Sequence, residues 1–287
     1  MKTETSDRSI AGKGLASFVA KILLLSLALF VLLSIDFMSF KLSVTTFDVA
    51  AATYLVSLLD TVVVALALTR MQSSRGGLFY AIFAVFYGVT SLLVALESVY
   101  LGPLFPVAAA VRVIIDGAIR GVLFSAACVL LLAPLNVRLP VAQSRRLVMS
   151  KGEWTWKLIV SGIFWMLLFI LFGFAVYIPL AGYLDPVGLA KEQSINLPAW
   201  TLPFQAIHGV IWVALTIPMM KMLRVEWKRT ALLVAALYGI LSVGNLLVPT
   251  GMSPGLQAAH SAEILGESFA FGIVAVWLFH LGSRLPT

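Results

Sequence analysis

The chain has 287 residues, of which 61% are hydrophobic and only 11% are charged. A soluble globular domain carries about a quarter charged residues, so this composition excludes that class. The formal charge of +7 therefore does not indicate a nucleic-acid partner. In a membrane protein, the distribution of basic residues among the connectors indicates the orientation of the helices. The single cysteine, Cys128, excludes an intrachain disulfide and any metal or iron–sulfur site built from several cysteines.

The first apolar segment covers residues 15–37 and follows a basic start over residues 1–14. It is longer than the apolar core of a signal peptide, and the sequence that ends it, "SIDFMSF", contains no small-residue cleavage pattern. We therefore expect a first membrane helix that is retained in the mature protein.

Seven further apolar segments follow, and a helix needs about 20 such residues to cross a bilayer. They cover residues 49–69, 77–99, 106–133, 156–183, 200–222, 230–250 and 256–282. The connectors are too short to hold a folded soluble domain. The sequence thus predicts an all-α, polytopic integral membrane protein. Its single domain is a bundle of about eight transmembrane helices over residues 15–283, between an N-terminal segment 1–14 and a C-terminal tail 284–287.

The basic residues indicate how this bundle is oriented. Sixteen lysines and arginines fall at one side of the predicted membrane, whereas the other side has only Lys41 and Lys191. Basic residues accumulate in cytoplasmic connectors, so we expect both termini in the cytoplasm of a multi-pass cell-membrane protein. The basic connectors also offer contacts to anionic headgroups of the lipid bilayer, which is the one partner that the composition requires.

Ionisable side chains also occur inside the predicted spans, where they are costly unless they face the protein interior. They concentrate in the second, fourth, sixth and eighth segments, while the odd-numbered segments carry charges only near their ends. We therefore expect the even-numbered helices to face one another, with the odd-numbered ones screening them from lipid. The charges lie about 4 to 14 positions from the outer helix ends, or roughly 6 to 21 Å. This depth predicts a polar pocket in the outer half of the bilayer.

The fourth segment carries Arg112, Asp116 and Arg120 at four-residue spacing, so they share one helix face. Two interpretations stay open. Asp116 could lie between two guanidiniums in a self-neutralising ladder, or the arginines could clamp an anionic group with their bidentate forks. Gly117 and Gly121 form a small-residue motif beside them, which predicts the close approach of a neighbouring backbone.

The sixth and eighth segments carry the two intramembrane histidines. His260, Glu263 and Glu267 lie on one stripe of the last segment, and Gln205 precedes His208 by one helical turn. His208, His260 and Glu263 are candidate ligands for a divalent transition metal, and the two histidines are candidate axial ligands for a b-type haem. They could also relay protons beside the carboxylates, or serve only as hydrogen-bonded structural residues.

Three more polar residues are secondary candidates. Asp60 stands alone in the second segment, and its structural alternative is a protonated acid hydrogen-bonded to a hydroxyl such as that of Ser57. Glu97 lies close to the outer interface, where a solvated role is equally open. Asn245 adds an amide near the outer end of the seventh segment.

The pattern favours a small secondary transporter or proton-coupled permease for a small molecule or an ion. In this hypothesis Arg112 and Arg120 contact an anionic group, and His260, Glu263 and Glu267 carry protons. One alternative is a membrane-embedded enzyme or electron-transfer protein that binds metal or haem, although the sequence requires no cofactor. The other is a non-catalytic membrane subunit or assembly factor. No H-E-x-x-H, G-x-S-x-G, Walker or dinucleotide motif indicates a known soluble chemistry.

Overall fold

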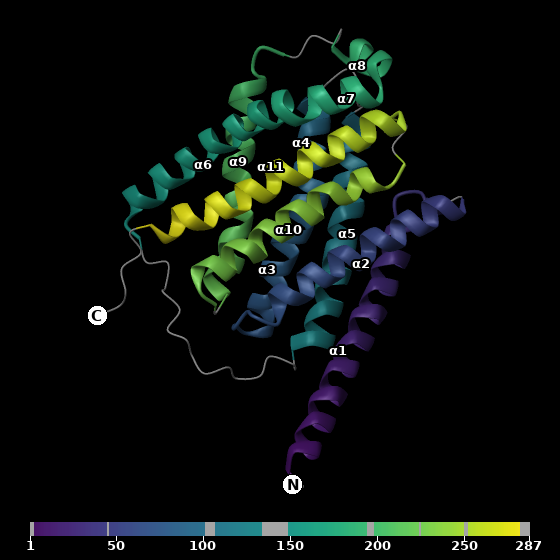
Figure 1. Ribbon diagram of the computed structural model, residues 1–287, viewed down its shortest axis with the longest axis vertical. Coiled ribbons are helices and arrows are strands. Elements are labelled where there is room, and N and C mark those ends of the chain that lie inside the picture. Colours follow the sequence, from purple (N-terminus) through teal and green to yellow (C-terminus); the bar gives the residue numbers. More distant parts are fainter. Residues whose placement is uncertain are drawn as a thin grey trace.

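The protein is almost entirely helical (Figure 1). The computed structural model describes residues 3–44, 46–100, 107–133, 149–193, 198–223, 225–249 and 252–281, with side chains from residue 14 onward. Within these residues, eight helices are long and apolar enough to cross a membrane. They cover Gly14–Leu33, Phe47–Leu68, Arg75–Tyr100, Val107–Leu132, Lys151–Leu184, Thr201–Met222, Trp227–Leu247 and Pro254–His280. The prediction of an all-helical protein with eight apolar, membrane-length helices is therefore confirmed.

The elements follow one another with short connections. They are α1 (Thr3–Leu33), β1 (Ile35–Asp36), β2 (Lys41–Leu42), α2 (Phe47–Leu68), α3 (Arg75–Tyr87), η1 (Gly88–Leu92), α4 (Leu93–Tyr100), α5 (Val107–Leu132), α6 (Lys151–Phe172), η4 (Gly173–Tyr177), α7 (Ile178–Leu184), α8 (Pro186–Gln193), α9 (Thr201–Met222), α10 (Trp227–Leu247) and α11 (Pro254–His280). The third long helix therefore runs through α3, η1 and α4, and the fifth runs through α6, η4 and α7. The predicted tail 284–287 lies outside the described residues.

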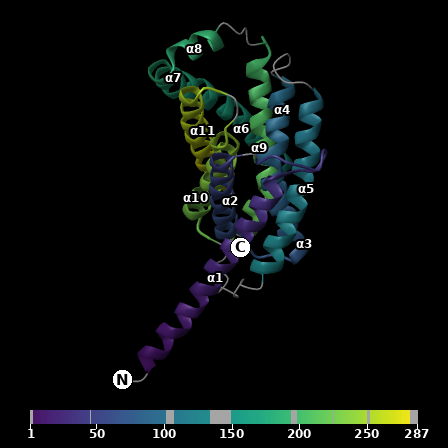
Figure 2. The ribbon, with the colours of Figure 1, turned by 90° about the vertical axis from the view of Figure 1, so that its right-hand side faces the viewer.

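The eight long helices pack in a closed ring. Its order is α6, α11, α10, α2, α1, α5, α3 and α9, with α9 packed back against α6. In the view of Figure 2, α2, α10 and α11 lie on one side of the ring, and α4, α5 and α9 lie on the other. Contacts between α10 and η1 and between α2 and α5 join the two sides.

Serine and threonine side chains fix the starts of several helices. Thr46, Ser74, Ser150 and Ser253 each accept a hydrogen bond from a backbone N–H in the first turn of α2, α3, α6 and α11, respectively. Such residues satisfy N–H groups that have no partner inside the helix. At α6 the Glu153 carboxylate in turn accepts a hydrogen bond from the backbone N–H of Ser150, which completes a capping box.

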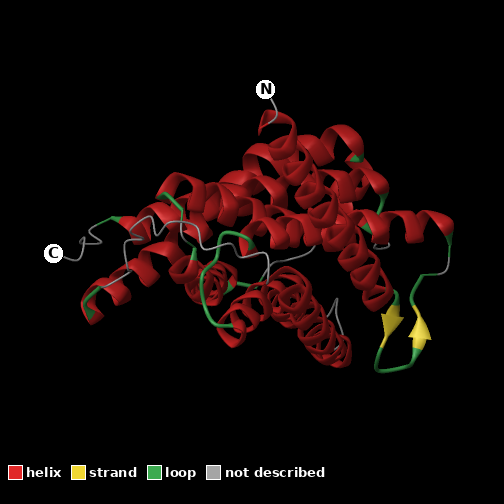
Figure 3. Ribbon diagram, turned by 90° about the horizontal axis from the view of Figure 1, so that it is seen from below, coloured by secondary structure: helices red, strands yellow, loops and turns green. Residues whose placement is uncertain are grey.

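The first long helix ends earlier than the predicted boundary at residue 37. After Leu33 the chain forms the small antiparallel pair β1–β2, in which Ile35 faces Leu42 (Figure 3). The Asp36 carboxylate holds the intervening turn, since it accepts hydrogen bonds from the Ser39 hydroxyl at 2.6 Å and from the backbone N–H of Met38 at 3.1 Å. These bonds, led by that of Ser39, keep the pKa of Asp36 below its usual value.

Two π-helical turns interrupt the third and fifth long helices. In η1 the Thr90 hydroxyl bonds the Phe86 carbonyl at 2.7 Å, and the Asn245 amide of α10 donates to the Thr90 carbonyl at 3.0 Å. In the fifth helix Pro179 is the second residue after η4. A proline ring clashes with the carbonyl four residues earlier, and a wider turn relieves that clash.

The prediction that odd-numbered helices screen the even-numbered ones is wrong for two of them. The third and seventh long helices are the most enclosed, with 61% and 56% of their apolar window buried, against 39% for the fourth and sixth. The first and fifth, at 17% and 22%, are the exposed ones. Hydropathy does not separate lipid-facing from core helices. Small residues allow the close packing of α10 and α11, since a Cβ on Gly272 of α11 would lie only 2.5 Å from the Cα of Ala235 of α10.

Buried Lys157 ties the start of α6 to the end of α11. Its Nζ donates to the Leu281 carbonyl at 2.5 Å and lies 5.9 Å from the Phe279 ring centroid. The start of α6 and the end of α11 therefore lie at the same end of the bundle, as the sequence predicted. Which end faces the cytoplasm stays a prediction.

The aromatic residues near the ends of the long helices divide into two groups. Trp156, Trp200, Tyr183 and Trp227 are exposed, as anchors at a membrane surface would be. Tyr100 is buried and stacks on Phe204 with 4.4 Å between ring centroids. Tyr100 therefore packs inside the bundle.

Candidate functional site

The three charged residues of α5 hold the end of α1 and its hairpin. Arg120 donates from Nε to the Leu32 carbonyl at 3.1 Å and from Nη2 to the Ile35 carbonyl at 2.7 Å. Both acceptors lie where α1 ends, so the guanidinium satisfies carbonyls that the helix leaves free. This contact closes the last turn of the first long helix.

Arg112 and Asp116 bind the hairpin itself. Arg112 Nη1 lies 3.1 Å from Asp36 Oδ2, and buried Asp116 accepts the backbone N–H of Met38 at 3.1 Å. The expected ladder, with Asp116 in direct ion pairs with two guanidiniums, is not among the described salt bridges. No described contact of these side chains reaches the histidines or glutamates of α9 and α11.

The glycine motif of α5 packs as the sequence predicted. A Cβ on Gly117 would lie 2.1 Å from Ser91 Oγ of η1, and one on Gly121 would lie 3.0 Å from Tyr87 Cβ of α3. The absence of side chains at both positions lets the fourth helix approach the third closely. This face of α5 is therefore a packing surface.

His208 lies at the centre of a second polar group. Its Nδ1 is 3.4 Å from the Oε1 atoms of both Glu97, in α4, and Gln205, in α9. Its Nε2 is buried without a hydrogen-bond partner among the described residues. A neutral histidine that shares a proton through Nδ1 keeps an unused lone pair on Nε2, so the ring has spare acceptor capacity.

Aromatic rings fix the position of His208. Trp165 meets it edge-on with 5.7 Å between ring centroids, and Phe204 lies at 5.5 Å. The Trp165 indole N–H donates to Gln205 Oε1 at 2.8 Å. Trp165 therefore orients both the amide and the imidazole, and the histidine ring is left only 2% exposed.

His260, Glu263 and Glu267, which share one face of α11, form the other half of the site. His260 Nδ1 lies 2.8 Å from Glu263 Oε2, as the three-residue spacing allows. The Tyr177 ring of η4 meets the His260 ring edge-on at 5.6 Å, and the Tyr177 hydroxyl donates to the Glu192 carboxylate of α8. A Cβ on Gly173 would lie 3.5 Å from Glu263 Oε1, so the glycine that opens η4 leaves room for this carboxylate.

Glu267 lies deeper on the same stripe. It is 5% exposed, and its Oε2 has no hydrogen-bond partner among the described residues. Glu97 and Glu263 both act on it electrostatically, and Glu97 also interacts with His260. The two halves of the site therefore meet. We call Glu97, His208, His260, Glu263 and Glu267 the glutamate–histidine cluster.

Two secondary candidates lie outside this cluster. Asp60 is 3% exposed, its Oδ1 has no partner among the described residues, and it lies next to Gly244 of α10. The expected bond from Ser57 is wrong, because the Ser57 hydroxyl donates to the Thr53 carbonyl at 2.7 Å. The Asn245 amide donates to the Thr90 carbonyl in η1, whereas Gln205 contacts His208.

The geometry does not favour a metal or haem at this site. In the part of the chain that the structure describes, no three His, Cys, Asp or Glu side chains converge as ligands for a metal ion. His208 has the free Nε2 of a ligand histidine, but Trp165, Phe204 and Trp212 surround its ring and leave no space for a macrocycle. Two open cavities on the surface lie elsewhere, one over α5 and one between α2 and α10.

Sequence reasoning missed Trp165, Tyr177 and Glu192. Trp165 and Tyr177 lie in apolar runs where an aromatic residue is indistinguishable from a lipid-facing one. Glu192 belongs to the connector 184–200, which has the composition of a loop but forms helix α8. Pro179, two residues after Tyr177, was the one sequence signal for this part of the site, because a proline inside a helix predicts an irregular turn nearby.

The fold and the buried cluster define a multi-pass membrane protein with an ionisable interior. More particular relationships were sought by comparison with known proteins. No protein family, no curated protein and no solved structure matches this chain. The function is therefore argued from the glutamate–histidine cluster alone.

Proposed function

We propose that the protein is a proton-coupled secondary transporter of the cell membrane and that the glutamate–histidine cluster exchanges protons for a small cation. The observation that carries this proposal is that Glu97, Glu263 and Glu267 act on one another electrostatically, with Glu263 and Glu267 buried and Glu97 38% exposed. Within the described residues no lysine or arginine neutralises them. The anionic substrate expected from the sequence has no support here, because Arg112 and Arg120 hold the hairpin and the end of α1.

Like charges in a low-dielectric interior cannot all ionise together. A proton or a cation bound among the three carboxylates would relieve this repulsion. Release of a proton and binding of a cation become alternatives at one site, which is the requirement for exchange. His260 extends this capacity, since its imidazole is 34% exposed and lies 2.8 Å from Glu263 Oε2.

The exposure of the side chains supports a path from the surface inward. Glu97 and His260 have side chains that are 38% and 34% exposed, whereas Glu263 is at 7%. Glu267, at 5%, lies further along the helix. Protons or cations would reach the exposed pair first and Glu267 last. Glu97 also lies 3.4 Å from His208, whose free Nε2 offers a further acceptor.

The test uses the full chain reconstituted in vesicles with a pH-sensitive dye inside. An imposed pH gradient should drive uptake of one or more of sodium, potassium, lithium or a small organic ammonium ion, and each should in turn dissipate the gradient. Glu267→Gln should abolish this exchange, whereas Glu226→Gln, at the exposed start of α10, should leave it intact.

Two results would overturn the proposal. One is exchange that survives both Glu267→Gln and His208→Ala at normal protein levels. The other is the absence of cation–proton exchange in the unmodified chain for every cation of the panel. The second result would favour the non-catalytic subunit instead.

A further inference from the structure

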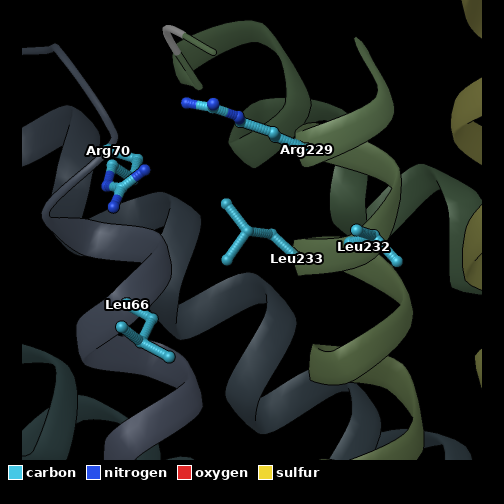
Figure 4. Close-up of a pocket in the computed structure, with 5 residues that line it drawn as sticks. All are labelled: Leu66, Arg70, Arg229, Leu232 and Leu233. Carbon is cyan, nitrogen blue, oxygen red and sulfur yellow. The ribbon is translucent and has the colours of Figure 1, made fainter. Parts of the chain in front are cut away.

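A second feature, separate from the glutamate–histidine cluster, lies at the C-terminal end of α2. A cavity of about 220 Å³ opens between α2 and α10, which are neighbours in the ring. Figure 4 shows Arg70, just after α2, and Arg229, in the first turn of α10, on opposite walls with Leu233 between them. Leu66 and Leu232 complete the lining.

The cavity combines two positive groups that have no internal partner. Within the described residues, neither Arg70 nor Arg229 makes a side-chain hydrogen bond or an ion pair. Glu226, at the start of α10, makes no side-chain cap, so the first backbone N–H groups stay available, while its carboxylate offsets part of the positive potential. Two unpaired guanidiniums in the same cavity form a site for an anion with several oxygens.

The remaining walls are apolar and open toward the lipid. Leu66 is 41% exposed and Leu232 is 57% exposed, so both present hydrocarbon to the outside of the bundle. Trp227, two residues before Arg229, is 39% exposed, as is typical of an indole at headgroup depth. The cavity thus places positive charge at the level of lipid phosphates and leucine side chains at the level of acyl chains.

We propose that this cavity binds an anionic phospholipid, with the phosphate held between Arg70 and Arg229 and the acyl chains lying along Leu66, Leu232 and Leu233. The ligand is a lipid rather than free phosphate because three of the five lining residues are leucines and two of these are open to the bilayer. The site is independent of the glutamate–histidine cluster, since it lies on a different pair of helices.

The experiment measures lipid binding to the purified full chain in detergent, by native mass spectrometry and by thermal shift. Dioleoyl phosphatidylglycerol should bind at least tenfold more tightly than dioleoyl phosphatidylcholine. Arg70→Gln with Arg229→Gln should weaken phosphatidylglycerol binding about 25-fold, at about fivefold for each basic residue. Arg75→Gln, an exposed arginine at the start of α3 and outside the cavity, should change nothing.

A second variant distinguishes the contribution of the cavity's space to lipid binding from the contribution of its charge. Leu233→Trp fills the space while keeping both guanidiniums, and it should also weaken phosphatidylglycerol binding. Equal binding of phosphatidylglycerol to the unmodified chain and to the double arginine variant would overturn the proposal. Thermal protection by inorganic phosphate that equals protection by the lipid would also overturn it, because the site would then hold a free anion.

Discussion

The carboxylate of Glu97 and the imidazole of His208 meet between α4 and α9, with 3.4 Å between Oε1 and Nδ1. One partner is 38% exposed and the other is enclosed by aromatic rings at 2%. A partly exposed group is thus joined to a buried one. In the proposed function, a proton from the surface would enter the interior of the bundle at this point.

Glu267→Gln should separate activity from stability. Glutamine has the same shape, and it removes a buried carboxylate whose Oε2 has no partner among the described residues. Burying a neutral amide costs less than burying an unpaired carboxylate. We expect an unchanged or higher melting temperature together with loss of cation–proton exchange, measured on the same preparation.

Asp60→Asn supplies the matched control for that experiment. Asp60 is as deeply buried as Glu267 and also has a carboxylate oxygen without a described partner, but it lies between α2 and α10 and outside the cluster. We expect an unchanged or higher melting temperature and retained exchange. Loss of exchange in this variant would extend the proton path to α2.

Arg120→Gln should destabilise the protein, because it removes the donors to the carbonyls of Leu32 and Ile35. Leaving such acceptors unsatisfied costs about 1–3 kcal/mol. Arg112→Gln is the control, since that side chain is 55% exposed and such ion pairs contribute about 0–1 kcal/mol. Chemical denaturation in detergent should rank the two variants in this order, and equal losses would contradict the assigned roles.

Gly272→Ala should disrupt the contact between α10 and α11. The new methyl would lie 2.5 Å from the Cα and 2.7 Å from the backbone N of Ala235, which cannot move aside as a side chain could. We expect a loss of about 1–3 kcal/mol, as for other overpacked positions. Gly76→Ala adds the same methyl where nothing lies within 4 Å, and it should leave stability unchanged or slightly raised.

Asp185 should make stability depend on pH in the acid range. Its carboxylate accepts hydrogen bonds from the Ser253 hydroxyl and from the Gly188 N–H at 2.9 Å, and these lower its pKa. A group whose folded pKa is below its unfolded value, about 3.9, stabilises the fold above that value and loses this effect as pH falls through the folded pKa. The melting temperature of the protein should exceed that of Asp185→Asn at pH 6, and the difference should vanish near pH 2.

Much of the fold could be predicted because bilayer thickness sets helix length. The eight long helices follow from apolar runs, and the pairing of His260 with Glu263 follows from helix periodicity. The partners of Arg112, Asp116 and Arg120 could not be predicted in this way. Spacing tells which residues share a face of one helix, but it does not tell which element that face meets.

The hairpin illustrates this limit. Residues 35–37 continue an apolar run, so hydropathy extends the first helix through them. The hydrogen bonds of Asp36 to Met38 and Ser39 instead favour a turn, and that turn then occupies the arginines of α5. Because the end of the first helix was misassigned, the hairpin was not expected as a partner of these arginines. The described contacts therefore do not support the predicted anion clamp.

The bond from Arg120 to the end of α1 also constrains how the chain assembles. α1 is synthesised first, yet the donor to its last free carbonyls belongs to the fourth long helix. Until α5 is in the membrane, Leu32 and Ile35 have to stay hydrated at the surface of the bilayer. The polar contacts at the end of α1 are therefore completed only after the fourth long helix has been inserted, although α1 also packs against α2.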